Sequence, residues 1–435
     1  MKKTLTLISA FLLLFSLCVN TYSVEIPNPK IEAASAILID AKSDYILYEK
    51  DADLKCYPAS TTKIMTALLA IEKLDTTAIA TASETAVDVD RDGSNMGILA
   101  REVLTVEQLL YGLLVHSAND AANVLAEEVS GSIEAFVADM NIRAAELGMT
   151  GTHFANPHGY HDDNHYTTAR DMSILAKEVM KNELFRKIVS TPTYEIPPTN
   201  RYTEIRYFSN NNSLINPMKG RKYLYTAATG IKTGHTSVAG NCLVSSAEKD
   251  GASYICVVLK APNTDGINYS FADTITLFDW GFDNFKMQTI SDIDEIMATK
   301  EVRWAKKGAQ AILTAKEPLN ALLPRGYSQD KLLKTLNEPE KITAPVKEGE
   351  TVGSITYSYD GRVLGEVELI NKKAVKRSFF KMIFGTLISW ILSIWVMGPL
   401  GIIAALLLLL RYRELKRQSK RRSQRKYANR RNFYQ

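Results

Sequence analysis

Ser60 and Lys63 are the first pair of residues whose types and spacing could do chemistry. Residues three apart lie on one face of a helix, so the lysine amine can reach the serine hydroxyl one turn before it. Residues 61–73 have apolar side chains at helical spacing, and burial in such a helix lowers the pKa of a lysine. A neutral amine beside a hydroxyl would give an activated nucleophile. The pair alone equally fits a capping serine with a solvated lysine.

Ser117 and Asn119 form a second polar pair, between the predicted helices at 106–116 and 120–129. A hydroxyl and an amide two residues apart on a tight loop can both point into a cleft. The hydroxyl could relay a proton there, and the amide could hold the backbone of a substrate. By itself the pair also fits an ordinary helix cap.

Lys232, Thr233 and Gly234 form a third group on a predicted strand, followed by His235 and Thr236. A glycine lets another backbone approach closely, which suits the docking of an extended peptide at a strand edge. The lysine and the threonine would bind a terminal carboxylate. The order of the three groups along the chain is a stronger observation than any one of them.

The elements around these groups favour an α/β (α+β) fold with an antiparallel sheet covered by helices. Strands are predicted at 36–40, 45–48, 236–247 and 254–259, and helices at 61–73, 106–116, 120–129, 133–147, 169–181 and 271–285. Strands near both ends with helices between them indicate one central sheet. This first domain is predicted to cover residues 24–289.

A small all-β domain is predicted at 290–371, where short alternating runs replace the helical pattern. It contains no catalytic constellation. The composition disfavours nucleic-acid binding, because residues 24–371 contain 34 basic and 47 acidic side chains, a charge near −13. Cys56, Cys242 and Cys256 lack metal-site spacing. The last two flank a predicted two-residue turn, which puts them on opposite faces of a sheet, and all three are expected to remain thiols.

Both ends of the chain have membrane-related patterns. Residues 1–23 are typical of a secretory signal peptide, with an uncleaved anchor as the alternative. Residues 382–410 contain no charged side chain, which predicts a transmembrane helix with a kink at Pro399. Residues 411–435 contain eleven Lys and Arg against one Glu, which is typical of a cytoplasmic tail. We therefore expect a single-pass protein of the cell membrane with its catalytic domain on the extracytoplasmic side. The tail either fixes this topology or binds anionic lipid.

The three polar groups, 57 and 115 residues apart, together form a specific signature. With it the chain resembles the D-alanyl-D-alanine carboxypeptidases, low-molecular-mass penicillin-binding proteins with a serine nucleophile. The resemblance covers about residues 33–285, and the β-rich region resembles the family's accessory C-terminal domain. The similar stretches are Pro58-Ala59-Ser60-Thr61-Thr62-Lys63-Ile64-Met65-Thr66, His116-Ser117-Ala118-Asn119-Asp120-Ala121-Ala122, Asn156-Pro157-His158-Gly159, His165-Tyr166-Thr167-Thr168-Ala169-Arg170-Asp171 and Gly230-Ile231-Lys232-Thr233-Gly234-His235-Thr236.

The resemblance implies removal of the terminal D-alanine from peptidoglycan stem pentapeptides through an acyl-enzyme on Ser60. Lys63 would be the base, and Ser117 would pass a proton to the leaving D-alanine. β-Lactam antibiotics, which mimic the dipeptide, should acylate the same serine. No cofactor is implied.

The rest of the site is expected to bind substrate. Lys232 and Thr233 would hold the terminal carboxylate, and the backbone N–H groups of Ser60 and His235 would form an oxyanion hole. Asn119, Gly234 and Thr236 complete the expected substrate-binding residues. One departure from the family is that no basic residue occurs between Lys260 and Lys286, where many members have an arginine that grips the carboxylate.

Three other functions use related residues. A β-lactamase needs a Glu-x-x-Leu-Asn motif, which is missing between Asn119 and Lys232. A D,D-endopeptidase or transpeptidase acting on crosslinks has the same motifs, and a non-hydrolytic penicillin-binding receptor would use Ser60 only as a trap. His158, His161 and His165 with two aspartates suggest a metal site, but a glycine-containing loop offers them no fixed face.

Overall fold

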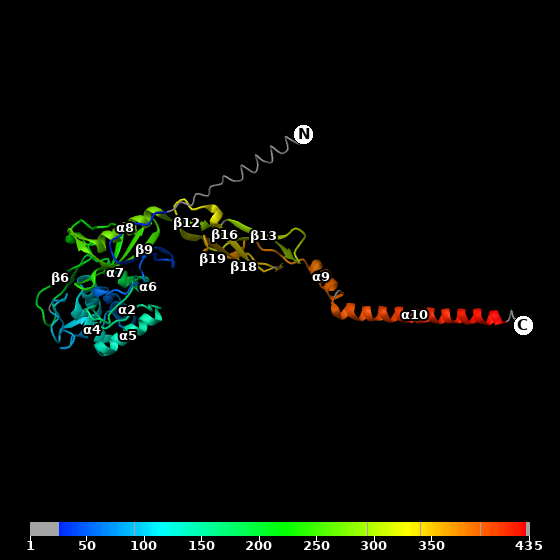
Figure 1. Cartoon of the computed structure of the whole chain (residues 1–435), viewed down its shortest axis with the longest axis horizontal. Helices are drawn as coiled ribbons and strands as arrows, with labels where there is room; N and C mark the ends of the chain where they lie inside the picture. Colours follow the sequence, from blue (N-terminus) through cyan, green and yellow to red (C-terminus); the bar gives the residue numbers. More distant parts are fainter. Residues whose placement is uncertain (1–25, 91, 294, 340, 392, 432–435) are drawn as a thin grey trace, which may run out of the picture. The chain divides into compact units, whose positions relative to one another are not determined.

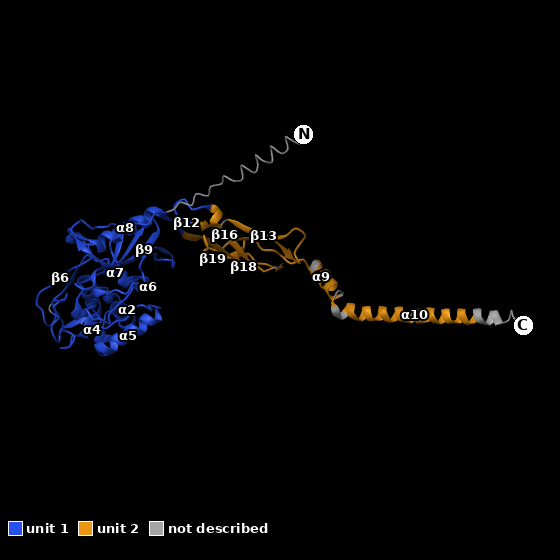
Figure 2. Ribbon diagram, viewed as in Figure 1, with its two compact units in different colours: residues 1–288, 322–328 blue, residues 289–321, 329–435 orange. Residues whose placement is uncertain are grey.

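The computed structural model describes residues 26–431 apart from 91, 294, 340 and 392. The chain forms two compact units (Figure 2). Unit 1 comprises Met1–Gln288 and Leu322–Ser328, and unit 2 comprises Thr289–Ala321 and Gln329–Gln435. The signal peptide predicted at 1–23 lies outside the described residues.

An antiparallel sheet forms the centre of unit 1, with helices on both faces (Figure 1). Its five strands lie in the order β2-β1-β9-β8-β7. The strands are β1 (Ser35–Asp40), β2 (Ile46–Lys50), β7 (Ala228–Thr236), β8 (Gly240–Lys249) and β9 (Ala252–Ala261). The first hairpin thus pairs with strands from the far end of the unit, as the sequence predicts, and β7 lies at one edge.

The two faces of the sheet pack into different hydrophobic cores. Ile37 of β1 packs on the face of α2 (Lys63–Lys73), whereas Leu38 packs on the face of α8 (Tyr269–Asn284). Cys242 and Cys256 divide in the same way, and both are free buried thiols. The prediction that these two cysteines face opposite sides of the sheet is confirmed.

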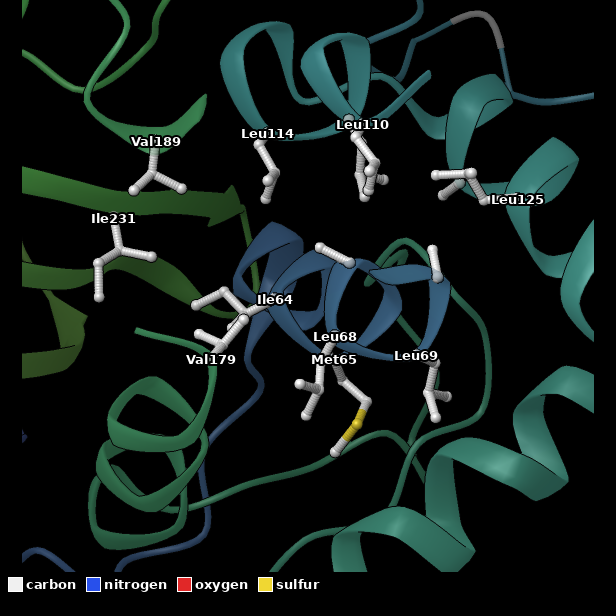
Figure 3. Close-up of a cluster of buried hydrophobic side chains, with 14 of the residues drawn as sticks. Ile64, Met65, Leu68, Leu69, Leu110, Leu114, Leu125, Val179, Val189 and Ile231 are labelled. Carbon is white, nitrogen blue, oxygen red and sulfur yellow. The ribbon is translucent and has the colours of Figure 1, made fainter. Parts of the chain in front are cut away.

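Helix α2 (Lys63–Lys73) lies inside the larger core, directly after the 3-10 turn η1 (Ala59–Thr62). Residues 63–70 of this helix are all buried. Apolar side chains such as Leu114, Val179 and Ile231 surround it (Figure 3). The helices of this core are α2, α3 (Val106–Tyr111), α4 (Asn119–Ser130), α5 (Ile133–Glu146), α6 (Ala169–Val179) and α7 (Glu183–Val189).

Several short elements differ from the prediction. The helix predicted at 106–116 ends in a π-helical turn, η2 (Gly112–His116). The strand predicted at 236–247 is wrong at its start, because β7 ends at Thr236 and the hairpin turn precedes β8. Helix α7 and the short strands β3 (Ile79–Thr81), β4 (Val103–Thr105), β5 (Thr193–Ile196), β6 (Arg206–Ser209), β10 (Asn263–Thr264) and β11 (Ile267–Asn268) are too short for a clear periodicity and were not predicted.

Unit 2 contains a six-stranded sheet in the order β16-β18-β19-β14-β13-β17. Its strands are β13 (Ile296–Arg303), β14 (Gln310–Ala315), β16 (Leu332–Asn337), β17 (Ile342–Thr343), β18 (Thr351–Tyr359) and β19 (Arg362–Asn371). The chain passes from one unit to the other within β12 (Phe285–Ser291), within β15 (Leu319–Pro324) and again between Ser328 and Gln329. The prediction of a small all-β domain is confirmed.

The C-terminal apolar stretch forms two helices rather than the single one predicted at 382–410. Helix α9 (Phe379–Ile391) ends before Pro399, and α10 (Ile394–Arg431) contains that proline. Within α10, Val396–Arg425 is long and apolar enough to cross a membrane, with a mean hydropathy of 1.6 for its most apolar window. This helix is a candidate membrane anchor.

Arg206 of β6 and Glu102, which follows a turn before β4, form a largely buried ion pair. The Glu102 carboxylate also accepts hydrogen bonds from Leu99 N and Thr199 Oγ1. The replacement Arg206→Ala leaves a buried carboxylate without its cation, so we expect the free energy of unfolding to fall by about 3 kcal/mol in chemical denaturation. The double variant Glu102→Gln/Arg206→Ala should recover part of this loss. Unchanged stability of the single variant would contradict the buried pair.

Candidate active site

The structure brings Ser60 and Lys63 together at the start of α2. Lys63 Nζ lies 3.1 Å from Ser60 Oγ, 2.7 Å from Asn119 Oδ1 and 2.8 Å from the carbonyl oxygen of His158. The lysine side chain is fully buried. Burial, with a smaller contribution from the Lys232 charge, holds the pKa of Lys63 well below its usual range, although Asp120 opposes the shift. The amine is therefore suited to accept the Ser60 proton.

Ser117 and Asn119 lie where η2 meets α4, as predicted for a loop between helices. Ser117 has a left-handed backbone with φ of 71° and lines the same cleft as Ser60. Asn119 Oδ1 accepts a hydrogen bond from Lys63 Nζ, which leaves the Asn119 Nδ2 group for other partners. The sequence suggested only a substrate-holding role for this amide. In the structure it also fixes the lysine amine.

Strand β7 brings the third group against the turn that carries Ser60. A Cβ atom on Gly234 would lie 2.9 Å from Pro58 O and 3.0 Å from Ser60 N, so only glycine allows this approach. Thr233, Gly234, His235 and Thr236 all line the cleft. The predicted site residues from three distant parts of the sequence thus meet in one place.

The side chain of Lys232, a residue of β7, is buried and does not line the cleft. Its side chain is only 1% exposed, and its Nζ donates a hydrogen bond to Thr233 O. Burial lowers the pKa of Lys232 to about 7. The sequence places a lysine on the correct strand, but the pattern of residues does not predict that its amine is enclosed.

The cleft has a volume of about 730 Å³. Its lining includes residues that the sequence did not single out, namely Asp92, Gly93, Ser94, Asn211, Asn241, Asn268, Ser270 and Phe271. Asn211 donates to His116 O, and Asn268 donates to Asn241 Oδ1. No lysine or arginine is among the described lining residues, in keeping with the arginine that the sequence lacks after Lys260.

Two of the three histidines considered for a metal site, His158 and His165, make hydrogen bonds within the protein. His165 Nδ1 accepts a hydrogen bond from Ala155 N, and its Nε2 lies 2.8 Å from Thr62 Oγ1. His158 Nδ1 accepts a backbone hydrogen bond. Burial lowers the pKa of His158 to about 3 and that of His165 to about 4. Within the described part of the chain, no group of three or more His, Cys, Asp or Glu side chains could hold a metal ion.

Comparison with known proteins identifies the family. A family model described as D-alanyl-D-alanine carboxypeptidase matches residues 21–263. The chain belongs to this carboxypeptidase family. A second model, described as the C-terminal domain of penicillin-binding protein 5, matches residues 285–377. The carboxypeptidase is therefore a serine peptidase with the transpeptidase-like fold and the C-terminal β domain that the sequence indicates.

Individual relatives cover most of this carboxypeptidase. The D-alanyl-D-alanine carboxypeptidase DacF of Bacillus subtilis is 34% identical over 80% of the chain and 87% of its own length. DacC of Escherichia coli is 32% identical over 86% of the chain and 91% of its own length. The crystal structure of penicillin-binding protein 5 from Haemophilus influenzae superposes with a TM-score of 0.62 at 29% identity, covering 81% of this chain and all of that one. The two-domain arrangement of the sequence is thus shared with known carboxypeptidases.

The two buried lysines predict a bell-shaped pH profile. Lys63 must be neutral to act as a base, and its lowered pKa makes the rate constant kcat/KM for a D-Ala-D-Ala peptide rise at a pH far below the usual lysine range. Lys232 supplies positive charge only while protonated, so kcat/KM should fall as the pH passes above about 7. Stopped-time assays across pH 4–10 measure both limbs.

A matched control separates the two lysines. In Lys232→Arg the charge persists at every pH in this range, so the falling limb should disappear while the rising limb stays. A wild-type profile that keeps rising to pH 10 would contradict the assignment of a lowered pKa to Lys63.

Proposed function

We propose that this carboxypeptidase removes the C-terminal D-alanine from peptidoglycan stem pentapeptides through an acyl-enzyme on Ser60. The observation that carries the proposal is the contact of 3.1 Å between Lys63 Nζ and Ser60 Oγ, made by a buried amine beside a cleft that β7 borders. Buried amines are costly unless neutral, and a neutral amine at this distance is a general base.

In the proposed acylation, Lys63 takes the hydroxyl proton as Ser60 Oγ bonds to the carbonyl carbon of the D-Ala-D-Ala bond. Ser117, which lines the same cleft, relays this proton from Lys63 to the nitrogen as the C–N bond breaks. D-Alanine then leaves as a free amine. Water attacks the ester and releases the shortened peptide, which regenerates the serine.

The proposed oxyanion hole consists of the backbone N–H groups of Ser60 and His235. The close approach of Gly234 to Ser60 N supports this arrangement, because it brings the two backbones side by side. One such donor typically accounts for about 3 kcal/mol of transition-state stabilisation. The edge position of β7 suits a substrate that docks as an extra strand.

The substrate carboxylate would be bound by Thr233 and neighbouring polar groups, with Lys232 acting through its charge. The side chains of Thr236, Asn241 and Asn268 offer further hydroxyl and amide donors in the cleft. We propose that these neutral groups replace the family arginine. β-Lactams, which present a carboxylate and a strained amide, would enter in the same way and acylate Ser60.

Cleavage of crosslinked peptides is the second candidate function. The described lining of the cleft has no guanidinium that demands a free terminal carboxylate, which favours acceptance of an internal bond. A solved relative at 30% identity and a TM-score of 0.54, the DD-transpeptidase of Streptomyces K15, covers 59% of this chain and all of its own. It is named for transpeptidation, in which an amine takes the place of water as the acceptor of the acyl group.

For topology, we propose that helix α10 anchors the protein as a single span, with the catalytic unit on the extracytoplasmic side. The basic residues 411–425 of the C-terminal tail support this orientation. We retain residues 24–289 as the catalytic domain and 290–371 as the accessory domain of the exported part, with the span within 382–410 and the tail at 411–435.

The reaction is tested with the detergent-solubilised full chain and a synthetic stem pentapeptide. Mass spectrometry should show loss of one alanine from the peptide, and the Ser60→Ala and Lys63→Ala variants should lose turnover by at least about 10³-fold, together with labelling by fluorescent penicillin. The exposed hydroxyl of Ser190 provides a control, because Ser190→Ala removes a serine outside the cleft and should leave both signals unchanged.

The outcomes distinguish the candidate functions. Release of D-alanine supports the carboxypeptidase, and cleavage of a crosslinked dimer at a comparable rate supports the endopeptidase. A persistent acyl adduct without product would support a receptor. Undiminished labelling of Ser60→Ala would overturn the assigned nucleophile.

A further inference from the structure

A chain of hydrogen bonds runs from the interior of the protein to the backbone just before Ser60. Ala155 N donates to His165 Nδ1, and His165 Nε2 lies 2.8 Å from Thr62 Oγ1. Thr62 Oγ1 donates to Ala59 O over 2.8 Å. The His165 and Thr62 side chains are buried, and neither belongs to the lining of the cleft.

The direction of each bond in this chain is determined. His165 Nδ1 accepts a proton from the backbone, so the single proton of the neutral ring is on Nε2. Burial lowers the pKa of His165 to about 4, which keeps the ring neutral at neutral pH. The Nε2–H group therefore donates to Thr62 Oγ1. The hydroxyl proton of Thr62 is then directed to Ala59 O.

The acceptor at the end of the chain belongs to an unusual peptide unit. Ala59 has a φ of 48°, a left-handed conformation that L-residues rarely adopt. Its carbonyl oxygen is also enclosed by the backbone of Gly159, where an added Cβ would lie only 1.8 Å from it. The orientation of this carbonyl is thus fixed from two sides.

The Ala59 carbonyl and the Ser60 N–H belong to the same peptide plane and point in opposite directions. The two ends of this plane have different neighbours in the structure. The oxygen faces Gly159 and Thr62, whereas the nitrogen faces Gly234 of β7. Any rotation of the Ala59 carbonyl therefore turns the Ser60 N–H away from its direction toward β7.

We propose that His165 and Thr62 are positioning residues that aim the Ser60 N–H as an oxyanion donor by holding the Ala59 carbonyl. This inference rests on the proposed function, in which that N–H binds the oxyanion. Neither side chain touches the substrate. They affect the reaction by fixing the orientation of the peptide plane between Ala59 and Ser60.

The test uses the carbonyl stretching frequency of the acyl-enzyme, because hydrogen bonds from an oxyanion hole lower that frequency. The full-length protein is acylated with a β-lactam carrying ¹²C or ¹³C at the reactive carbonyl, and the infrared difference spectrum isolates this band. In Thr62→Val, which keeps the shape of the side chain but removes its hydroxyl, the band should move to higher frequency. Acylation should slow by about tenfold, a fraction of the effect of losing a whole donor.

Three further variants control for folding. Thr62→Ser keeps the hydroxyl and should resemble the wild type. Thr61→Val removes an equally buried hydroxyl of the same turn, one that bonds Pro58 O, and its band should not move. If Thr62→Val does not fold, His165→Leu interrupts the chain at its other end and should also raise the frequency.

The failure of this inference is distinguishable from failure of the proposed function. An unmoved carbonyl band in acylated Thr62→Val, or an equal shift in Thr61→Val, would overturn the positioning role and leave Ser60 as the nucleophile. A wild-type protein that forms no Ser60 adduct would instead refute the proposed function.

Discussion

The burial of Lys63 is the constraint on which the rest of the structure depends. Burying an ammonium in a hydrophobic core costs free energy, so the fold has to keep this amine neutral and give each of its N–H groups a partner. Its partners come from three separate parts of the chain: the neutral amine donates to Asn119 Oδ1 and to the His158 carbonyl, and its lone pair faces the Ser60 hydroxyl. Helix α2 can hold the lysine there because it is buried along its first eight residues. The packing of the hydrophobic core therefore also positions the proposed catalytic lysine.

The other elements of unit 1 bring the remaining groups to this amine. The π-helical turn and the left-handed Ser117 place a hydroxyl at the cleft and start α4 with Asn119. The edge strand β7 approaches the Ser60 turn through a glycine, and the loop with His158 and Gly159 approaches the same turn from another direction. Glycine occurs at both contacts because a side chain would collide with backbone there.

The sequence predicts the parts of this arrangement that depend on strong periodicity or on residue types at short spacing. The buried helix after Ser60, the helices α4, α5, α6 and α8, the helical run of α3 and η2, and the strands β1, β2 and β9 follow from hydrophobic patterns. The order of the three polar groups along the chain, which matches the family signature, predicts that they form one site. Other features depend on packing between distant parts of the chain, which no local sequence pattern predicts. They are the burial of Lys232 and the hydrogen bonds of Lys63 to the Asn119 amide and the His158 carbonyl. The break between α9 and α10 lies within one uninterrupted apolar run, where hydropathy alone cannot mark a helix end.

The protonation state of Lys63 in the resting enzyme shows most directly whether this amine can act as a base. Nuclear magnetic resonance of protein labelled with ¹³C at the lysine ε-carbon, with Lys63→Arg to assign the signal, follows this one amine through a pH titration. We expect the Lys63 signal to change from the chemical shift of an ammonium to that of a neutral amine well below the pH at which surface lysines titrate. A signal that keeps the shift of an ammonium group up to pH 10 would contradict it.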